Sequence, residues 1–501
     1  MDLLLDLRRD VGEPLRRRLE RELREAVQTG RLLPGTALPS TRALAAQLGV
    51  SRGVIVEAYG QLVAEGYLTA RQGAATVVAA RHGGAPAHGA AAWHIDPYIR
   101  GQSATRDGAA AHDHPAWRVD PYIRGQSAMR SSAAPLPLPR YDFRYGTPDL
   151  SSFPRSAWLA ASARSLRTLA DARLGYGDPR GAVESRRALA AYLGRVRGVI
   201  ADPELMVLTA GTRHALSLVW SVLRDAGVRR IAIENPGWSA QRETALTAGL
   251  EPVPVAVDER GLRVGDLLEA DAGAVVLTPA HQCPTGAVLA PDRRAAVIDW
   301  ARQRDALIVE DDYDAEYRYD REPVGALQGM APEHVVYAGS ASKTLAPALR
   351  LGWLVLPEGL AAAASEARWH ADRGSALSDQ IALADLIARG ELDRHLRRMR
   401  GRYRARRDAV VAALHEELPE ASVRGIAAGL HATVELTAAD DERAIAEEAA
   451  RRRLALMTLG EVRRIAPAGP ATLLVGYAQL PEPAIPAAIR ELAAAVRAAR
   501  A

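Results

Sequence analysis

The chain has 501 residues, of which 48% are hydrophobic, so it can bury several full-size cores and is not an intrinsically disordered protein. A single cysteine, Cys283, excludes internal disulfide bonds and fits a reducing compartment. No apolar stretch approaches the roughly 18 residues of a membrane span, so we expect a cytoplasmic protein with no membrane partner. A net charge of +4 is too small to predict nucleic-acid binding by the chain as a whole.

Three short helices are predicted in the first 80 residues. Residues 13–29 carry leucines on one stripe and end at Gly30, while Ser40 and Ser51 are suited to cap a second and a third helix. Two short helices joined by a tight turn that contains glycine are typical of a helix-turn-helix. Residues 69–79 alternate weakly, as a small β-hairpin wing would.

The charge pattern of this region favours contact with phosphate. Residues 26–56 contain no Asp or Glu but include Arg31, Arg42 and Arg52. One surface of the first domain could therefore meet a nucleic acid without local repulsion, although a merely neutral segment has the same composition.

Residues 81–140 are rich in Ala, Gly, Pro and His and are predicted to be a linker. The linker contains a duplication, because WHIDPYIRGQSATR at Trp93 returns as WRVDPYIRGQSAMR at Trp117. Two copies are too few for a solenoid. The copies could dock on the partner domain or on DNA, or they could be a tolerated duplication in a tether.

From residue 141 onward, short apolar runs alternate with helical stretches, which predicts a mostly parallel sheet. The runs lie at residues 205–209, 231–233, 274–277, 306–309, 335–337 and 353–356. After about residue 362 the pattern changes to arginine-rich helices and then to strands around 430–436 and 473–477. We therefore expect domains at 1–80 and 141–501, the second divided into a large α/β part (141–361) and a smaller C-terminal α+β part (362–501).

Lys343 is the only lysine among 64 Lys plus Arg residues. Unlike arginine, lysine can lose its proton and attack a carbonyl, so we expect a Schiff base here, although codon bias could leave one lysine by chance. Ser340, Ser342 and Arg350 around it suit a phosphate dianion. Pyridoxal phosphate is the cofactor that joins an aldehyde to such a phosphate.

Further groups that suit this cofactor lie upstream of Lys343. Asp311 follows an apolar run, and a carboxylate just past a strand could hold a pyridinium nitrogen protonated. Free amides at the helix start after Gly211 and Thr212 would bind an anion. Trp238 at a strand end could stack on the ring, or it could belong to the core.

Three separated motifs resemble a known family. IVEDDYDAEYRY (308–319), SASK followed by LR (340–350) and TPAHQCPTG (278–286) together resemble the fold-type I aminotransferase domain of MocR-type regulators, a branch of the GntR superfamily. LPSTRALAAQLGVSRGVIVEAYGQLVAEGYL (38–68) is similar to GntR-type winged helices. The resemblance implies that the third helix enters the major groove of operator DNA, with Ser51, Arg52 and Val54 facing it and Arg42 supporting from the second helix.

The resemblance also implies residue roles around pyridoxal phosphate. Lys343 would form the Schiff base, Asp311 would hold the pyridinium, Trp238 would stack, and Tyr313 with Gln282 would bond the 3-hydroxyl. Tyr176 would reach the cofactor phosphate of the neighbouring subunit, which implies a homodimer. The phosphate would otherwise be held by Gly211, Thr212, Ser340, Ser342 and Arg350.

Two departures from working aminotransferases shape the functional hypothesis. Cys283 replaces the usual asparagine before Pro-Thr-Gly, and Leu474 stands about where an arginine usually clamps the substrate α-carboxylate. We therefore expect a regulator that senses pyridoxal phosphate or an amine whose acidic group is held elsewhere, with the arginines of 394–407 as candidates. The alternatives are an active aminotransferase with a vestigial DNA arm and a purely structural dimerisation domain.

Overall fold

The structure is a computed structural model that describes residues 14–70, 75–79, 139–314, 316–319, 324–425, 428–462 and 469–500. Within these ranges, no helix is long and apolar enough to cross a bilayer. The predicted linker and its duplication lie almost wholly outside the described residues, as does the middle of the predicted wing.

The N-terminal part is a three-helix unit with a short antiparallel hairpin. It comprises α1 (Leu15–Gln28), α2 (Thr41–Leu48), α3 (Arg52–Glu65), β1 (Leu68–Thr69) and β2 (Val77–Val78). The Ser40 Oγ accepts a hydrogen bond from the Ala43 amide at 3.2 Å and caps α2 as predicted. Ser51 stands at the N-cap of α3, but its side chain makes no capping bond to that helix, so this part of the prediction is wrong.

An eight-stranded sheet forms the centre of the large part. Its order is β4 (Met206–Thr209), β11 (Gly352–Val355), β10 (Val335–Ser340), β9 (Leu307–Asp312), β8 (Ala274–Leu277), β5 (Arg230–Asn235), β6 (Glu251–Asp258) and β7 (Gly261–Leu262). β10, β9, β8, β5 and β6 run parallel, while β11 pairs antiparallel with both β10 and β4. A mostly parallel sheet is what the apolar runs predicted.

The acidic run of β9 differs from expectation in one respect. Glu310, Asp311 and Asp312 are the last residues of the strand and do not follow it, because pairing with β10 continues to Asp312 opposite Gly339. Alternate side chains of a strand point to opposite faces of the sheet. Asp311 therefore lies on the face opposite to that of Glu310 and Asp312.

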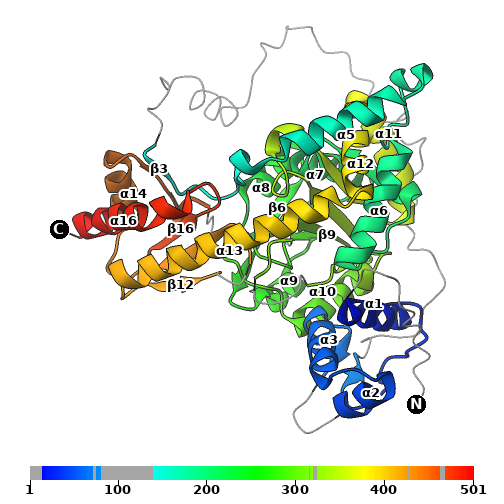
Figure 1. The fold of residues 1–501 in the computed structure, drawn as a ribbon, viewed down its shortest axis with the longest axis horizontal. Coiled ribbons are helices and arrows are strands. Elements are labelled where there is room, and N and C mark those ends of the chain that lie inside the picture. Colours follow the sequence, from blue (N-terminus) through cyan, green and yellow to red (C-terminus); the bar gives the residue numbers. More distant parts are fainter. Residues whose placement is uncertain are drawn as a thin grey trace, which may run out of the picture.

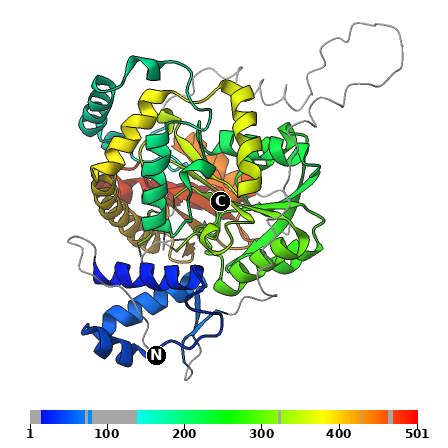
Figure 2. The same ribbon diagram turned by 90° about the vertical axis from the view of Figure 1, so that its right-hand side faces the viewer.

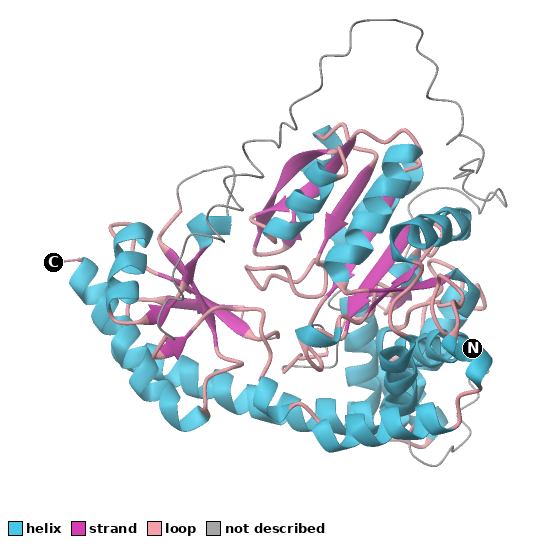
Figure 3. Ribbon diagram, turned by 90° about the horizontal axis from the view of Figure 1, so that it is seen from above, coloured by secondary structure: helices cyan, strands magenta, loops and turns pink. Residues whose placement is uncertain are grey.

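Helices cover both faces of this sheet, as Figure 3 shows. One core contains side chains of α7 (Thr212–Asp225), α8 (Ser239–Thr247) and α11 (Glu358–Asp372), and another contains those of α9 (Val264–Glu269) and α10 (Pro291–Arg304). α12 (Leu377–Ala388) packs on α5 (Arg155–Arg167) and α6 (Val183–Arg197). Since α11 and α12 pack on helices of the large part, we propose that its boundary lies at about residue 390 and not at the expected 362.

The long helix α13 (Glu391–Glu417) runs across to a smaller C-terminal part (Figure 1). That part consists of β12 (Ser422–Arg424), β13 (His431–Glu435), β16 (Thr472–Gly476) and β15 (Met457–Thr458) in one sheet, with α14 (Glu442–Arg451), α15 (Leu459–Val462) and α16 (Ile485–Ala499). β14 (Leu454–Ala455) pairs with β3 (Tyr141–Asp142), which ties the start of the aminotransferase-like region to this part.

The N-terminal unit packs against the large part, and in Figures 1 and 2 it lies below that part. The Arg24 guanidinium lies 2.9 Å from the Glu65 carboxylate, and both side chains are largely buried. The buried Arg294 of α10 donates to the Glu65 carbonyl at 3.1 Å and to the Gly325 carbonyl at 2.6 Å. The Gln28 amide donates to the Gly329 carbonyl at 2.9 Å. The contact surface on the large part is therefore the segment 324–330 together with α10.

Candidate cofactor site and DNA-binding surface

Lys343 lies in the turn after β10, with its Nζ donating a hydrogen bond to the Gly146 carbonyl. Burial lowers the pKa of this amine, and the nearby charges of Cys283, Asp314 and Asp311 oppose that effect. An amine with a lowered pKa is more often neutral, and the neutral form is the one that attacks a carbonyl. The surroundings of Lys343 therefore suit the predicted chemistry.

Asp311 presents a buried carboxylate with one unsatisfied oxygen. Its Oδ2 accepts from the Gln241 amide at 3.2 Å, whereas its Oδ1 is buried and has no partner among the described residues. Burial raises the pKa of Asp311 to about 7. A positively charged N–H of a bound ring would supply the missing donor and favour the ionised carboxylate. Asp311 thus fits a pyridinium nitrogen.

The N-terminus of α7 and the guanidinium of Arg350 lie side by side. Gly211 is the N-cap of α7 with φ 86°, and a Cβ built on it would lie 3.3 Å from Arg350 Nη1. The Ser340 hydroxyl donates to the Ser342 Oγ at 2.8 Å, at the end of the neighbouring strand β10. Thr212 is the first residue of α7. Helix amides, hydroxyls and a guanidinium are the donors that bind a phosphate dianion.

Tyr313 lies beside a histidine–carboxylate pair that sequence reasoning missed. Its hydroxyl is 3.0 Å from His281 Nδ1, which is also 3.0 Å from the nearer Asp314 oxygen. A Cβ on Gly429 would overlap the His281 ring, so glycine is required there. His281 stands inside the quoted motif TPAHQCPTG, but nothing in the spacing indicates that it meets Tyr313.

Gln282 has its amide fully engaged with the backbone and with Thr285. Its Nε2 donates to the carbonyls of Pro236 and Cys283, and its Oε1 accepts from the amide and hydroxyl of Thr285. The structure therefore places Gln282 as a support for the turn that carries Cys283. Its direct contact with a cofactor hydroxyl stays a prediction.

Two aromatic residues of the prediction lie in contrasting places. Trp238 is the half-buried N-cap residue of α8 and packs against the core between α7 and the sheet. Tyr176 is 83% exposed, and the Arg373 guanidinium lies 5.3 Å from its ring centroid. Trp238 is therefore packed within this chain, whereas the Tyr176 side chain is largely exposed.

The position expected to clamp a carboxylate is apolar. Leu474 of β16 is fully buried and packs with Leu459 and Val462 of α15. Several arginines of α13 that were candidates for an acid-binding role make contacts elsewhere. Arg400, Arg404 and Arg406 donate to backbone carbonyls, and Arg402 donates to Ser152.

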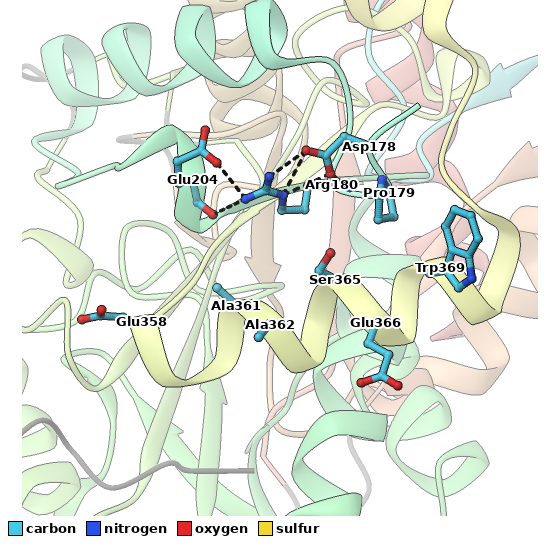
Figure 4. A pocket seen from close by; sticks show the side chains of 10 residues that line it. All are labelled: Asp178, Pro179, Arg180, Glu204, Glu358, Ala361, Ala362, Ser365, Glu366 and Trp369. Atoms are coloured by element: carbon cyan, nitrogen blue, oxygen red, sulfur yellow. Dashed lines mark hydrogen bonds and ion pairs between the residues drawn. The ribbon is translucent and has the colours of Figure 1, made fainter. Parts of the chain in front are cut away.

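A hollow of about 610 Å³ lies apart from these residues, between α11 and the segment 178–180 (Figure 4). Its arginine, Arg180, is held by Asp178 at 2.7 Å and Glu204 at 2.9 Å, as the dashed lines in Figure 4 show. None of its lining residues belongs to the predicted cofactor site. We assign it no part in cofactor binding.

The predicted DNA-contacting residues lie together on the helix-turn-helix. Arg42, Ser51 and Arg52 are exposed, and Val54 is half-buried. The Arg52 Nε donates to the Thr41 hydroxyl at 3.3 Å, so the third helix and the start of the second present one basic surface. Exposed arginines at the start of a recognition helix are suited to bases and phosphates.

Comparison with known proteins assigns both regions. Residues 15–78 match the model of the gntR family of bacterial regulatory proteins, and residues 142–478 match that of class I and II aminotransferases. The chain is 32% identical over 416 residues to the HTH-type pyridoxine biosynthesis transcriptional regulator PdxR of Corynebacterium glutamicum, covering 83% of this chain and 82% of that protein.

Two further similarities extend the assignment. The probable rhizopine catabolism regulatory protein MocR of Rhizobium meliloti is 32% identical over 430 residues, covering 83% and 80% of the two chains. The α-aminoadipate aminotransferase LysN of Thermus thermophilus, solved with N-(5'-phosphopyridoxyl)-L-leucine, superposes with a TM-score of 0.65 at 25% identity, over 72% of this chain and 92% of that one. Its cofactor-binding fold and the donors described above imply pyridoxal phosphate. The chain therefore belongs to the MocR-type transcriptional regulators of the GntR family, with a winged-helix DNA-binding region joined to a fold-type I aminotransferase domain that depends on pyridoxal phosphate.

Proposed function

We propose that this regulator acts in the cytoplasm as a homodimer that binds operator DNA and senses pyridoxal phosphate itself or an amine that reacts with it. The observation that carries the proposal is the arrangement of β9. One strand carries the carboxylate suited to the cofactor ring and, on its other face, two carboxylates that hold the surface on which the DNA arm packs.

At the cofactor, each residue has one task. Pyridoxal phosphate supplies a reactive carbonyl carbon and an electron-withdrawing ring when bound. Lys343 would attach it, Asp311 would keep a proton on the ring nitrogen, Tyr313 would orient the 3-hydroxyl and Trp238 would stack on the ring. The phosphate would be held by Gly211, Thr212, Ser340, Ser342, Arg350 and Tyr176 of the second subunit.

On the other face of β9, Glu310 accepts hydrogen bonds from the amides of Leu327 and Gln328, both at 3.0 Å. Asp312 accepts from Arg197 at 2.6 Å, and Arg197 in turn donates to the Val324 carbonyl. These bonds fix segment 324–330, which contacts the N-terminal unit. A change of charge at Asp311 would therefore occur next to the groups that position the N-terminal DNA-binding unit. A ligand that favours one position of this unit would increase the population of the molecules that have it.

Exposed apolar side chains support the homodimer. Tyr176 and Leu174 are 83% and 69% exposed, and Leu159 of the nearby helix α5 is 67% exposed. Large apolar side chains in this number on one region are typical of a surface that pairs. A second copy would cover them and bring Tyr176 to a neighbouring cofactor.

The rival function is an active aminotransferase, and the intact cofactor residues favour it as much as they favour sensing. The loss of a charged clamp at Leu474 favours sensing, because poor orientation of an α-amino acid slows transamination. A purely structural domain is disfavoured by the unsatisfied Asp311 oxygen, which a protein without cofactor would have no reason to keep.

The test compares the apo protein, the cofactor-loaded protein and the loaded protein with a panel of amines. Operator fragments are first selected from genomic DNA, and operator affinity and keto-acid release are then measured in parallel. We expect operator affinity to change with cofactor or amine while keto-acid release stays below one equivalent. Multiple turnovers with operator affinity indifferent to cofactor would overturn the regulatory proposal in favour of the enzyme.

A further inference from the structure

The apolar cluster around Leu474 borders the reactive end of the site. This Leu474 cluster consists of buried Leu459, Val462 and Leu474 with half-buried Tyr145 and Met457. Met457 pairs directly with Leu474 across the strands β15 and β16. Nothing in the cluster can neutralise a carboxylate, because its polar atoms are one phenol and one thioether.

The cluster is joined to Lys343 through its tyrosine. The residue after Tyr145 is Gly146, whose carbonyl accepts the hydrogen bond from Lys343 Nζ. The Tyr145 side chain also lies near the thiol of Cys283, and its ring centroid lies 5.0 Å from that of His431. A group attached next to an amine at Lys343 would therefore lie near the Leu474 cluster.

Among the residues that the structure describes, the charged and titratable groups around this place do not favour a bound carboxylate. Glu461 lies near Tyr145, and Asp314 lies near both Cys283 and Lys343. Burial lowers the pKa of His431 to about 4, so this ring is neutral at physiological pH. A ligand carboxylate here would lose its hydration to apolar side chains and meet acids, which is unfavourable.

We propose that the effector is a primary amine that bears no α-carboxylate and places a small apolar substituent against the Leu474 cluster. This inference rests on the proposed function and narrows its ligand to one chemical class. Amino acids that carry an α-carboxylate are the class that the site excludes.

The exchange at Lys343 needs no oxidant or further reactant. In this exchange the cofactor's carbonyl carbon would pass from Lys343 to the ligand amine. The bond between that carbon and Nζ would break, and a bond between the same carbon and the ligand nitrogen would form. The two protons lost by the neutral ligand amine end on Lys343 Nζ. No hydrogen leaves the ligand's α-carbon, so ligand exchange alone releases no keto acid.

Three probes share the same four-carbon chain, counted from the carbon that bears the amine, and differ in the group on that carbon. L-norvaline carries a carboxylate there, L-norvalinamide carries a neutral amide, and n-butylamine carries neither. Each is titrated into the full-length, cofactor-loaded protein, and binding is followed by cofactor absorbance and by borohydride trapping with mass spectrometry. Affinities are expressed per neutral amine, since the three amines have different pKa values. We expect norvalinamide and n-butylamine to bind roughly tenfold or more tightly than norvaline, as for a charged group placed without a partner. Norvaline binding as tightly as its amide would overturn the proposal.

An arginine placed at position 474 should reverse the order of the affinities for norvaline and its amide. Leu474→Arg should favour norvaline over its amide, while Leu474→Met, which keeps the site apolar, should leave the wild-type order unchanged. If Leu474→Arg fails to fold, the half-buried partner position provides Met457→Arg with the same expected reversal. An unchanged order in a folded arginine variant would also count against the proposal. Failure of the wild-type protein to bind cofactor would instead refute the proposed function, so the two failures are distinguishable.

Discussion

Lys343 and Arg52, the residues predicted to attach the cofactor and to contact DNA, lie in opposite surroundings. Lys343 is held by the Gly146 carbonyl among buried acids, close to a carboxylate whose second oxygen lacks a partner among the described residues. Arg52 is exposed on the third helix with one weak contact to Thr41. The cofactor site is thus built before its ligand arrives, whereas the DNA surface completes its contacts only on binding.

This difference sets the size of effect that a substitution should have. Buried charged groups depend on each other, so removing one leaves another unpaired in a low-dielectric interior. Exposed arginines act almost independently and are screened by salt. Substitutions of buried groups in the aminotransferase-like region should therefore have large effects on cofactor binding or stability. Substitutions of exposed arginines on the winged helix should have smaller effects on DNA binding.

The largest effect is expected for Lys343→Arg, which should abolish covalent attachment of cofactor completely. No other lysine exists in the chain to take over. The measurement is the mass of the borohydride-reduced protein together with its visible absorbance. Arg302→Lys in the same background is the control, because a half-buried lysine far along the chain should not restore attachment. A pyridoxyl group found within the folded Lys343→Arg chain would disprove the assignment.

The next largest effect is expected at the junction of the two regions. Arg294→Met should destabilise the protein by about 3 to 5 kcal/mol, because it removes the cation beside buried Glu310 and the bond to the Glu65 carbonyl. The measurement is chemical denaturation of the full chain, with limited proteolysis of the N-terminal unit. Arg302→Met on the same helix, paired with exposed Glu333, should cost under about 1 kcal/mol. Equal effects of the two changes would show that the junction is not a buried ionic contact.

The free energy of unfolding of the apo protein should depend on pH because the Asp311 carboxyl group is buried. Its pKa is about 7 in the folded chain against an ordinary 3.8, so the folded state binds the proton more tightly. Stability should therefore fall as pH rises from about 4 to 7, by as much as about 4 kcal/mol. In Asp311→Asn this contribution is absent, while Glu234 and Glu310 titrate in both proteins. Denaturation midpoints at pH 5 and pH 8 measure the difference, and parallel curves would contradict the prediction.

The smallest effect is expected on the exposed surface. Arg52→Ala should weaken operator binding by about 1 to 3 kcal/mol if the guanidinium contacts a base. If it contacts only phosphate, all sequences should weaken alike and the salt dependence should fall by about one unit. Arg443→Ala on α14, also exposed, controls for net charge. Two half-sites are expected in the operator because the proposed homodimer carries two DNA-binding units. Unchanged affinity and salt slope would remove the third helix from the interface.

The sequence alone determined the main element types, the helix-turn-helix and the mostly parallel character of the sheet, and it singled out Lys343 as the one lysine of the chain. These signals are local, since apolar periodicity, capping residues and motif spacing are all visible along the chain. The run 274–277 coincides with β8, whereas β9 extends three residues further than its apolar run. β9 can include these acidic residues because backbone pairing with β10 does not depend on side-chain polarity.

Only the tertiary structure decided which distant groups meet. His281 reaches Tyr313, Leu474 packs beside Tyr145, and Arg294 bridges two regions of the chain. No periodicity encodes these contacts, because each joins elements whose distance is set by how helices and strands pack in three dimensions. The same reason explains why Arg400 and Arg404, which belong to the basic run of α13, donate to carbonyls of neighbouring segments.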